Sequence, residues 1–159
     1  MAIIRAIAVK PHKREALVPQ DTVEVTELSG ITGDCRGLGG SRRSRQITLL
    51  SWQSWCDACA ALGRSPEELP WTLRRANICI DGYVFDVNHV GKQLRLGATV
   101  LLQVTGETTP CIRMDEAFPG LREALVPAFR GGVTARVLRG GTLSRGDEVS
   151  RPFLKPAPG

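Results

Sequence analysis

QLRLGATVLLQVT, residues 93–105, is the stretch of this sequence that decides its fold. Two runs, 93–96 and 99–105, flank Gly97, and apolar side chains alternate with others along the second run. A period of two is typical of a strand with one buried face, and a glycine between two such runs predicts a tight turn. The buried face of the second run would hold Val100, Leu102 and Val104.

Similar short patterns extend outward from this pair in both directions. We predict further strands at 3–9, 22–28, 46–50, 77–80, 133–138 and 147–150. One helix is expected from Trp52, with Ser51 as N-cap and Gly63 as the C′ residue, and a shorter one at 119–126, with Pro119 at its first position. Seven or eight short strands with glycine turns predict a mainly β fold, a small closed β-barrel decorated with two or three short helices, because closure removes unpaired edges.

Length and composition indicate one folded domain. The chain has 159 residues, of which 42% are hydrophobic and 23% charged, values typical of a globular domain and not of a disordered chain. We expect a single domain over 1–150 and a flexible, proline-rich tail over 151–159. No apolar run approaches the roughly 20 residues of a membrane span, and five cysteines without a signal peptide fit a reducing compartment. The expected protein is soluble and cytoplasmic, with no membrane partner.

The charge pattern favours an anionic ligand. Lys and Arg total 21 against 16 Asp and Glu, which gives a net charge of +5. Segment 29–45 carries five glycines and four arginines, and together with Arg74 and Arg75 it could line an anion site, because glycines let backbone amides approach a phosphate. The alternative is a set of solvated surface arginines. No GxxxxGK[ST] or GxGxxG motif supports nucleotide binding, and the lack of interleaved aromatic residues argues against nucleic acid.

The Cys56-Asp-Ala-Cys59 motif is interpreted as structural. Both cysteines fall on the apolar stripe of the predicted helix, whereas a thioredoxin-like thiol lies exposed at a helix N-terminus. No second CxxC or paired histidine completes a zinc site, and His12 and His89 are isolated in the sequence. We assign these residues no catalytic role.

Cys111 is the candidate reactive thiol. It follows a predicted strand and Pro110 in a polar turn, and a helical turn is expected from Ile112 to Glu116. Free backbone N–H groups at that turn, with Arg113 two residues on, favour nucleophilic or soft-metal chemistry. An inert loop thiol is the alternative reading of the same spacing.

The order of several segments resembles that of the MOSC domain, named for the C-terminal part of molybdenum cofactor sulfurases. The likeness covers about residues 2–150. The segments that carry it are GITGD (30–34), RQITLL (45–50), RANI (75–78), LRLG (94–97), VTGE (104–107), PC (110–111), GGVTARVL (131–138) and GDEV (146–149).

The resemblance implies a barrel of the MOSC or pyruvate-kinase type and a link to the molybdenum cofactor (molybdopterin), a pterin dithiolene with a phosphate. It implies that Cys111 is catalytic, either carrying sulfur as a persulfide or ligating molybdenum. Cys35 is a candidate second thiol, and Cys79 has no assigned role. The residues expected to bind the cofactor are Arg36, Arg45, Arg75, Asn77, Thr105 and Glu107.

The resemblance also limits what this chain does alone. The pyridoxal-phosphate domain of full-length sulfurases does not fit in 159 residues, so pyridoxal phosphate is not expected and the chain is not itself a complete cysteine desulfurase. A desulfurase or a redox protein is the expected partner, and reduction of N-hydroxylated compounds is one expected destination. The chain would act as an oxidoreductase component or as a sulfur transferase. Two alternatives stay open: a cofactor-free sulfur carrier, and a non-enzymatic barrel that binds an anionic ligand or nucleic acid.

Overall fold

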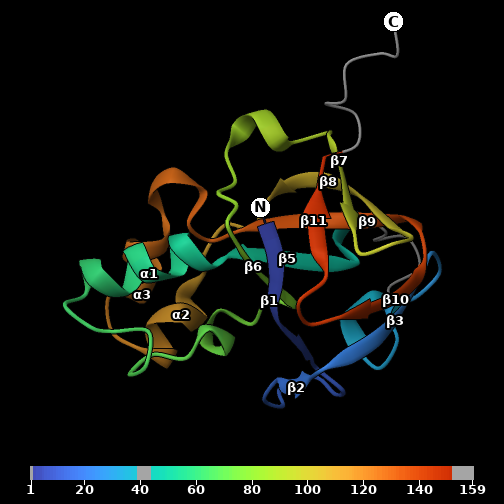
Figure 1. Ribbon diagram of the computed structural model, residues 1–159. Coiled ribbons are helices and arrows are strands. Elements are labelled where there is room, and N and C mark those ends of the chain that lie inside the picture. The colour runs from blue at the N-terminus through green and yellow to red at the C-terminus, as the bar shows by residue number, and fades with distance from the viewer. Residues whose placement is uncertain (1, 39–43, 152–159) are drawn as a thin grey trace, which may run out of the picture.

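The computed structural model describes residues 2–38 and 44–151 and is built around a closed barrel (Figure 1). Seven strands close it in the order β11-β7-β8-β9-β5-β6-β1, with β1 pairing back onto β11. Only β5 and β6 run parallel, and α1 connects them, as a parallel pair requires a crossover. The barrel strands are β1 (Ala2–Val9), β5 (Ile47–Ser51), β6 (Ile78–Asp81), β7 (Gln93–Leu96), β8 (Val100–Glu107), β9 (Val133–Arg139) and β11 (Glu148–Ser150).

The remaining elements decorate this barrel. Strand β2 (Val18–Gln20) extends it by pairing with β1, and β10 (Gly141–Ser144), β3 (Thr22–Thr26) and β4 (Gly30–Ile31) form a separate small sheet. The helices α1 (Trp52–Ala61), α2 (Ile112–Ala117) and α3 (Leu121–Leu125) gather on the side of the barrel away from that sheet (Figure 1). Short 3₁₀ turns are η1 (Cys35–Leu38), η3 (Trp71–Arg74), η4 (Val87–His89) and η5 (Pro127–Phe129).

Two apolar clusters stabilise this arrangement. The larger fills the barrel and includes the face predicted for the second run, with Val100, Leu102 and Val104 all buried. The smaller lies between the helices and the outside of β5 and centres on the buried Trp55. Inward-facing strand residues thus fill the barrel, and the helices cover one flank of it. No helix in the described part of the chain is long and apolar enough to cross a membrane.

The predicted barrel and the first helix are confirmed. Residues 93–96 pair with 100–103 as an antiparallel hairpin. Ser51 caps α1 by accepting a hydrogen bond from the Ser54 N–H at 3.3 Å, and Gly63 follows the helix at φ 67°.

Three details differ from the prediction. The helix expected over 119–126 spans only Leu121–Leu125, because Gly120 at φ 89° is left-handed and interrupts the helical backbone after Pro119. Strands β2, β4 and β10 were not predicted, since β2 and β4 contain only three and two residues and β10 begins at a glycine. Of the tail expected over 151–159, all but Arg151 lies outside the described residues.

Gly132 lies where the start of β9 comes very close to the backbone of β5. It has φ 93°, and a Cβ at this position would meet the Leu49 carbonyl oxygen at 2.2 Å. Gly132→Ala should therefore lower the free energy of unfolding by more than about 2 kcal/mol, from backbone strain and overpacking together. Gly63→Ala is the matched control, because its φ is 67° but nothing lies within 4 Å, and about 1 kcal/mol is expected. Equal losses in urea denaturation would contradict the close approach.

Candidate functional site

A cavity of about 500 Å³ lies where η1, β5, η3 and the segment from β8 to α2 meet. It is called the cationic cavity below, because six of its lining side chains are Lys or Arg and none is Asp or Glu. The cations are Lys13, Arg36, Arg45, Arg74, Arg75 and Arg113. The other lining residues are Cys35, Thr48, Ala76, Thr108, Cys111, Met114 and Gly131.

Arg74 is the buried cation of this cavity. It is only 7% exposed, and its Nε and Nη2 donate to the carbonyls of Gly131 and Thr108, both at 2.8 Å. Its Nη1 lies 3.8 Å from the sulfur of Met114, and among the described residues no carboxylate pairs with it. Burial lowers the pKa of Arg74 to about 10, while Cys111 acts in the opposite direction. Arg74 is thus a cation at neutral pH whose charge is not compensated by a carboxylate.

Two further donors in the same wall lack partners. Nη2 of Arg75 and Oγ1 of Thr108 are buried and make no hydrogen bond within the described structure. Arg75 adopts the left-handed conformation at φ 69°, and its carbonyl accepts a 2.5 Å hydrogen bond from Nη1 of Arg36. Because buried polar groups are nearly always satisfied, we expect a water molecule or a polar ligand to accept from these donors.

Cys111 lies exposed at the edge of the cavity. It precedes α2 as its N-cap residue, and its carbonyl accepts from the Met114 N–H at 2.9 Å. The helical turn predicted after Cys111 is therefore present. The strand β8 and the short helix α2 hold this thiol between them, next to Arg113 and within electrostatic range of Arg74.

The structure brings together only some of the residues expected to bind the cofactor. Arg36, Arg45 and Arg75 line the cavity with Cys111, whereas Asn77, Thr105 and Glu107 do not. The Thr105 hydroxyl donates a hydrogen bond to the Ser44 carbonyl, and its oxygen lies 2.8 Å from the Thr134 hydroxyl oxygen. Glu107 lies at the end of β8, where its backbone is opposite Val133 of β9.

Asn77 instead supports the cavity from behind. Its Oδ1 accepts from the Thr48 N–H and hydroxyl at 3.0 and 3.1 Å, and its Nδ2 donates to Asp34 at 2.7 Å and to the Ala8 carbonyl at 3.3 Å. With four hydrogen bonds inside the barrel wall, the Asn77 amide has no capacity left for a ligand. Thr48, which Asn77 holds, does line the cavity.

Asp34 is the buried carboxylate beneath these side chains, and the sequence did not single it out. It accepts from Lys10 N–H at 2.9 Å, from Asn77, and from the backbone N–H, Nε and Nη2 of Arg36 at 2.9, 3.1 and 2.9 Å. Burial alone would raise the pKa of Asp34, but the Arg36 side chain and the two backbone N–H groups lower it overall. Asp34 neutralises the charge of Arg36 and of no other cation of the cavity, and it fixes the position of the Arg36 side chain.

Arg74 was expected beside Arg75 in the candidate anion site but not among the residues expected to bind the cofactor, and Thr48 and Thr108 were not singled out. The Arg74-Arg75 pair was a visible signal, but the sequence could not tell that Arg74 turns inward and that its partners are carbonyls. Thr48 lies within the RQITLL segment, but no local pattern shows that its side chain or that of Thr108 reaches the cavity. The pairing of β5 with β9 and the end of β8 bring them there.

Cys56, Cys59 and Cys79 are less suited to chemistry, and none of them lines the cationic cavity. All five are free. Burial raises the pKa of Cys59 to about 11 and that of Cys79 to about 12, and it also raises the pKa of the half-buried Cys56. Cys56 and Cys59 thus have the surroundings of structural thiols. Within residues 2–38 and 44–151, no three His, Cys, Asp or Glu side chains gather as a metal site.

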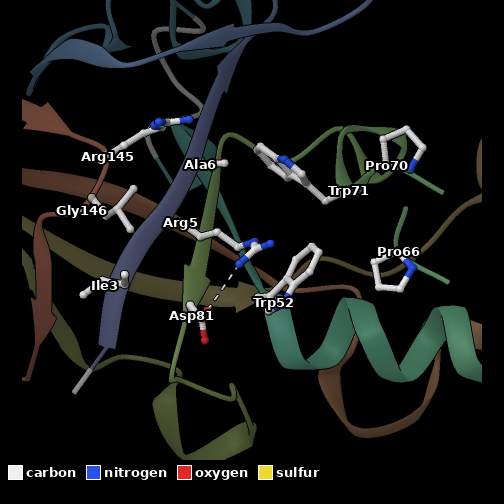
Figure 2. Close-up of a pocket in the computed structure, with 11 residues that line it drawn as sticks. Ile3, Arg5, Ala6, Trp52, Pro66, Pro70, Trp71, Asp81, Arg145 and Gly146 are labelled. Atoms are coloured by element: carbon white, nitrogen blue, oxygen red, sulfur yellow. Dashed lines mark ion pairs between the residues drawn. The ribbon is translucent and has the colours of Figure 1, made fainter. Parts of the chain in front are cut away.

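A second cavity, of about 680 Å³, lies on another face of the barrel and contains none of the expected site residues. Figure 2 shows its tryptophans, Trp52 and Trp71, on either side of the Arg5 side chain. The Arg5 guanidinium lies 3.7 Å from the ring centre of Trp52 and 3.6 Å from a carboxylate oxygen of Asp81. No nucleophilic thiol lines this cavity, so the candidate chemistry belongs to the cationic cavity.

The fold and the site together define a small closed β-barrel with a cationic cavity beside an exposed loop cysteine. A family model, the MOSC domain, matches residues 33–150, and the chain therefore belongs to the MOSC domain family. This family is linked in general to molybdenum cofactor sulfurases. No match to this chain is found among curated proteins.

Solved structures with the same fold include three bacterial proteins. The YuaD protein from Bacillus subtilis is 21% identical, with a TM-score of 0.75 over 94% of both chains. YiiM from Geobacillus stearothermophilus is 20% identical, with a TM-score of 0.73 over 95% of this chain and 75% of that one. YiiM from Escherichia coli is 16% identical, with a TM-score of 0.68 over 94% and 69%. These likenesses confirm the barrel.

The stabilising role of Asp34 should depend on pH. Because its pKa in the folded state is below the ordinary value of 3.8, its ionised form contributes stability that is present above that value and lost as the pH falls through the folded-state pKa. Asp34→Asn should lower the free energy of unfolding by about 2 kcal/mol at pH 7, and by less at pH 3. The exposed Asp57→Asn is the control, with little change expected at either pH. A loss at Asp34 that stays constant with pH would contradict this account.

Proposed function

We propose that the cationic cavity binds the molybdenum cofactor and that Cys111 is the thiol that acts on it, as carrier of its sulfur or as ligand of its metal. The observation that carries the proposal is the juxtaposition of an exposed thiol with a buried arginine that has no carboxylate partner. Membership of the MOSC family supports the choice of cofactor. A cysteine desulfurase is the proposed sulfur donor.

The residues of the cavity fit an anionic ligand that carries a phosphate. Six cations without a lining carboxylate favour an anion, and the free donors of Arg75 and Thr108 can satisfy its oxygens. Arg74 cannot move far, since two carbonyls hold its guanidinium, so it supplies a fixed positive charge. The cofactor, when bound, supplies a metal centre that accepts sulfur or electrons.

Cys111 supplies the sulfur chemistry. A thiolate is a soft ligand and a nucleophile, and the exposed position of Cys111 leaves it accessible to a protein donor. In sulfur transfer, the Cys111 thiolate attacks the outer sulfur of the donor persulfide. A new S–S bond forms at Cys111, and the donor cysteine leaves as a thiolate. Arg74 stabilises the anion that results, because its charge interacts with Cys111.

The proposal is tested by purifying the protein from a host that makes the cofactor and measuring molybdenum, pterin and persulfide. Wild type should carry cofactor and accept a persulfide at Cys111. Cys56→Ser should do the same, and it is the control because Cys56 is half-buried and does not line the cavity. Cys111→Ser should lose the persulfide. Absence of cofactor, together with unchanged persulfide labelling in Cys111→Ser, would contradict the proposal. Labelling of Cys111 without any cofactor would instead favour a cofactor-free sulfur carrier.

Arg75 should contribute directly to retention of the cofactor. Arg75→Gln removes a cation with an unpartnered donor, so the cofactor that co-purifies should fall about tenfold. Arg95→Gln is the matched control, because Arg95 is exposed on β7 and does not line the cavity. Molybdenum and pterin are measured in both variants, and an equal loss in the two would show that only net charge matters.

A further inference from the structure

The cationic cavity is lined by two cysteines that come from different parts of the chain. Cys35 belongs to η1, which follows the small sheet, and Cys111 lies between β8 and α2. Within the described residues these are the two thiols that line the cavity. The cavity therefore presents a pair of free thiols to one bound species.

The two thiols differ in access to solvent. Cys111 is exposed, whereas Cys35 is half-buried. The backbone of Cys35 is fixed from both sides, because its N–H donates to the Lys10 carbonyl at 2.8 Å and the neighbouring residues Asp34 and Arg36 are ion-paired at 2.9 Å. A large donor protein thus has access to Cys111 and much less access to Cys35.

Cys35 also lies among positive charges. Arg36 is its neighbour in the chain and in the cavity wall. Lys10 lies within electrostatic range of Cys35. Burial lowers the pKa of Lys10, and so do Arg75 and Arg36, whereas Cys35 acts in the opposite direction. The wall around Cys35 therefore carries positive charge, which attracts anionic sulfur species to this part of the cavity.

We propose that Cys35 is a second sulfur acceptor, which takes the outer sulfur of a persulfide formed on Cys111. The inference rests on the proposed function, since it needs Cys111 to carry sulfur. The Cys35 thiolate attacks the outer sulfur of the Cys111 persulfide and forms a new S–S bond. The S–S bond at Cys111 breaks, and Cys111 leaves as a thiolate. No oxidant or reductant is consumed.

The transfer moves sulfur from an exposed thiol to a protected one. Exchange of a persulfide with thiols in solution depends on access to its sulfur atoms. A persulfide at Cys35 is therefore lost to glutathione more slowly than one at Cys111. Transfer of the sulfur to Cys35 would also leave the Cys111 thiolate free to react with a second donor or to contact a bound metal.

The test uses the full-length protein and a cysteine desulfurase charged with ³⁴S-labelled cysteine. Samples are alkylated at intervals, and the labelled sulfur on each cysteine is measured by peptide mass spectrometry. In wild type the label should appear first on Cys111 and later on Cys35. In Cys35→Ser it should accumulate on Cys111, and in Cys111→Ser the label on Cys35 should fall at least tenfold. Cys56→Ser should behave as wild type.

Three outcomes overturn the relay while leaving sulfur transfer to Cys111 intact. The first is label on Cys111 that never reaches Cys35. The second is label on Cys35 that is undiminished in Cys111→Ser while wild-type Cys111 is still labelled. The third is a Cys35–Cys111 disulfide, with release of sulfide, in place of a Cys35 persulfide. If neither cysteine is labelled in wild type, sulfur transfer to Cys111 fails together with the relay.

Discussion

The buried carboxylate of Asp34 joins three segments that are distant in the sequence. It accepts hydrogen bonds from Lys10 directly after β1, from Arg36 in η1, and from Asn77 directly before β6. A buried charge is stable only when it is paired and hydrogen-bonded, so these segments must come together for Asp34 to be buried. Asn77 in turn holds Thr48, and Arg36 donates to the Arg75 carbonyl. One wall of the cationic cavity depends on this network.

Asp34 compensates a single arginine, and the other cations of the cavity have no carboxylate within its lining. Backbone carbonyls satisfy the hydrogen bonds of Arg74 but do not cancel its charge. The closed barrel gives these groups a rigid support, while the two thiols lie on short turns at its edge. An uncompensated positive site beside a pair of thiols is suited to anionic sulfur species and to an anionic cofactor.

The sequence predicted the barrel well because the signal is local. Alternating strands and glycine turns, such as those around Gly97, are properties of neighbouring residues, and α1 follows from its cap and stripe. The site was predicted in part. Charge predicted Arg36, Arg45 and Arg75 correctly as lining residues, but Asn77 and Thr105 bond to partners within the wall, and Glu107 does not line the cavity. The hydrogen-bond partners of the Asn77 side chain are 29 or more residues away along the sequence, so no local pattern could reveal them.

Cys111 borders a cavity whose lining holds six cations and no carboxylate, and anions should therefore approach this thiol more readily than cations. The most direct measurement compares the rates at which two methanethiosulfonate reagents of similar size, one anionic and one cationic, modify Cys111, followed by mass spectrometry. At low salt the anionic reagent should react at least about tenfold faster, and the ratio should approach one at high salt because salt screens the field. Equal rates at low salt, or a faster cationic reagent, would contradict the account.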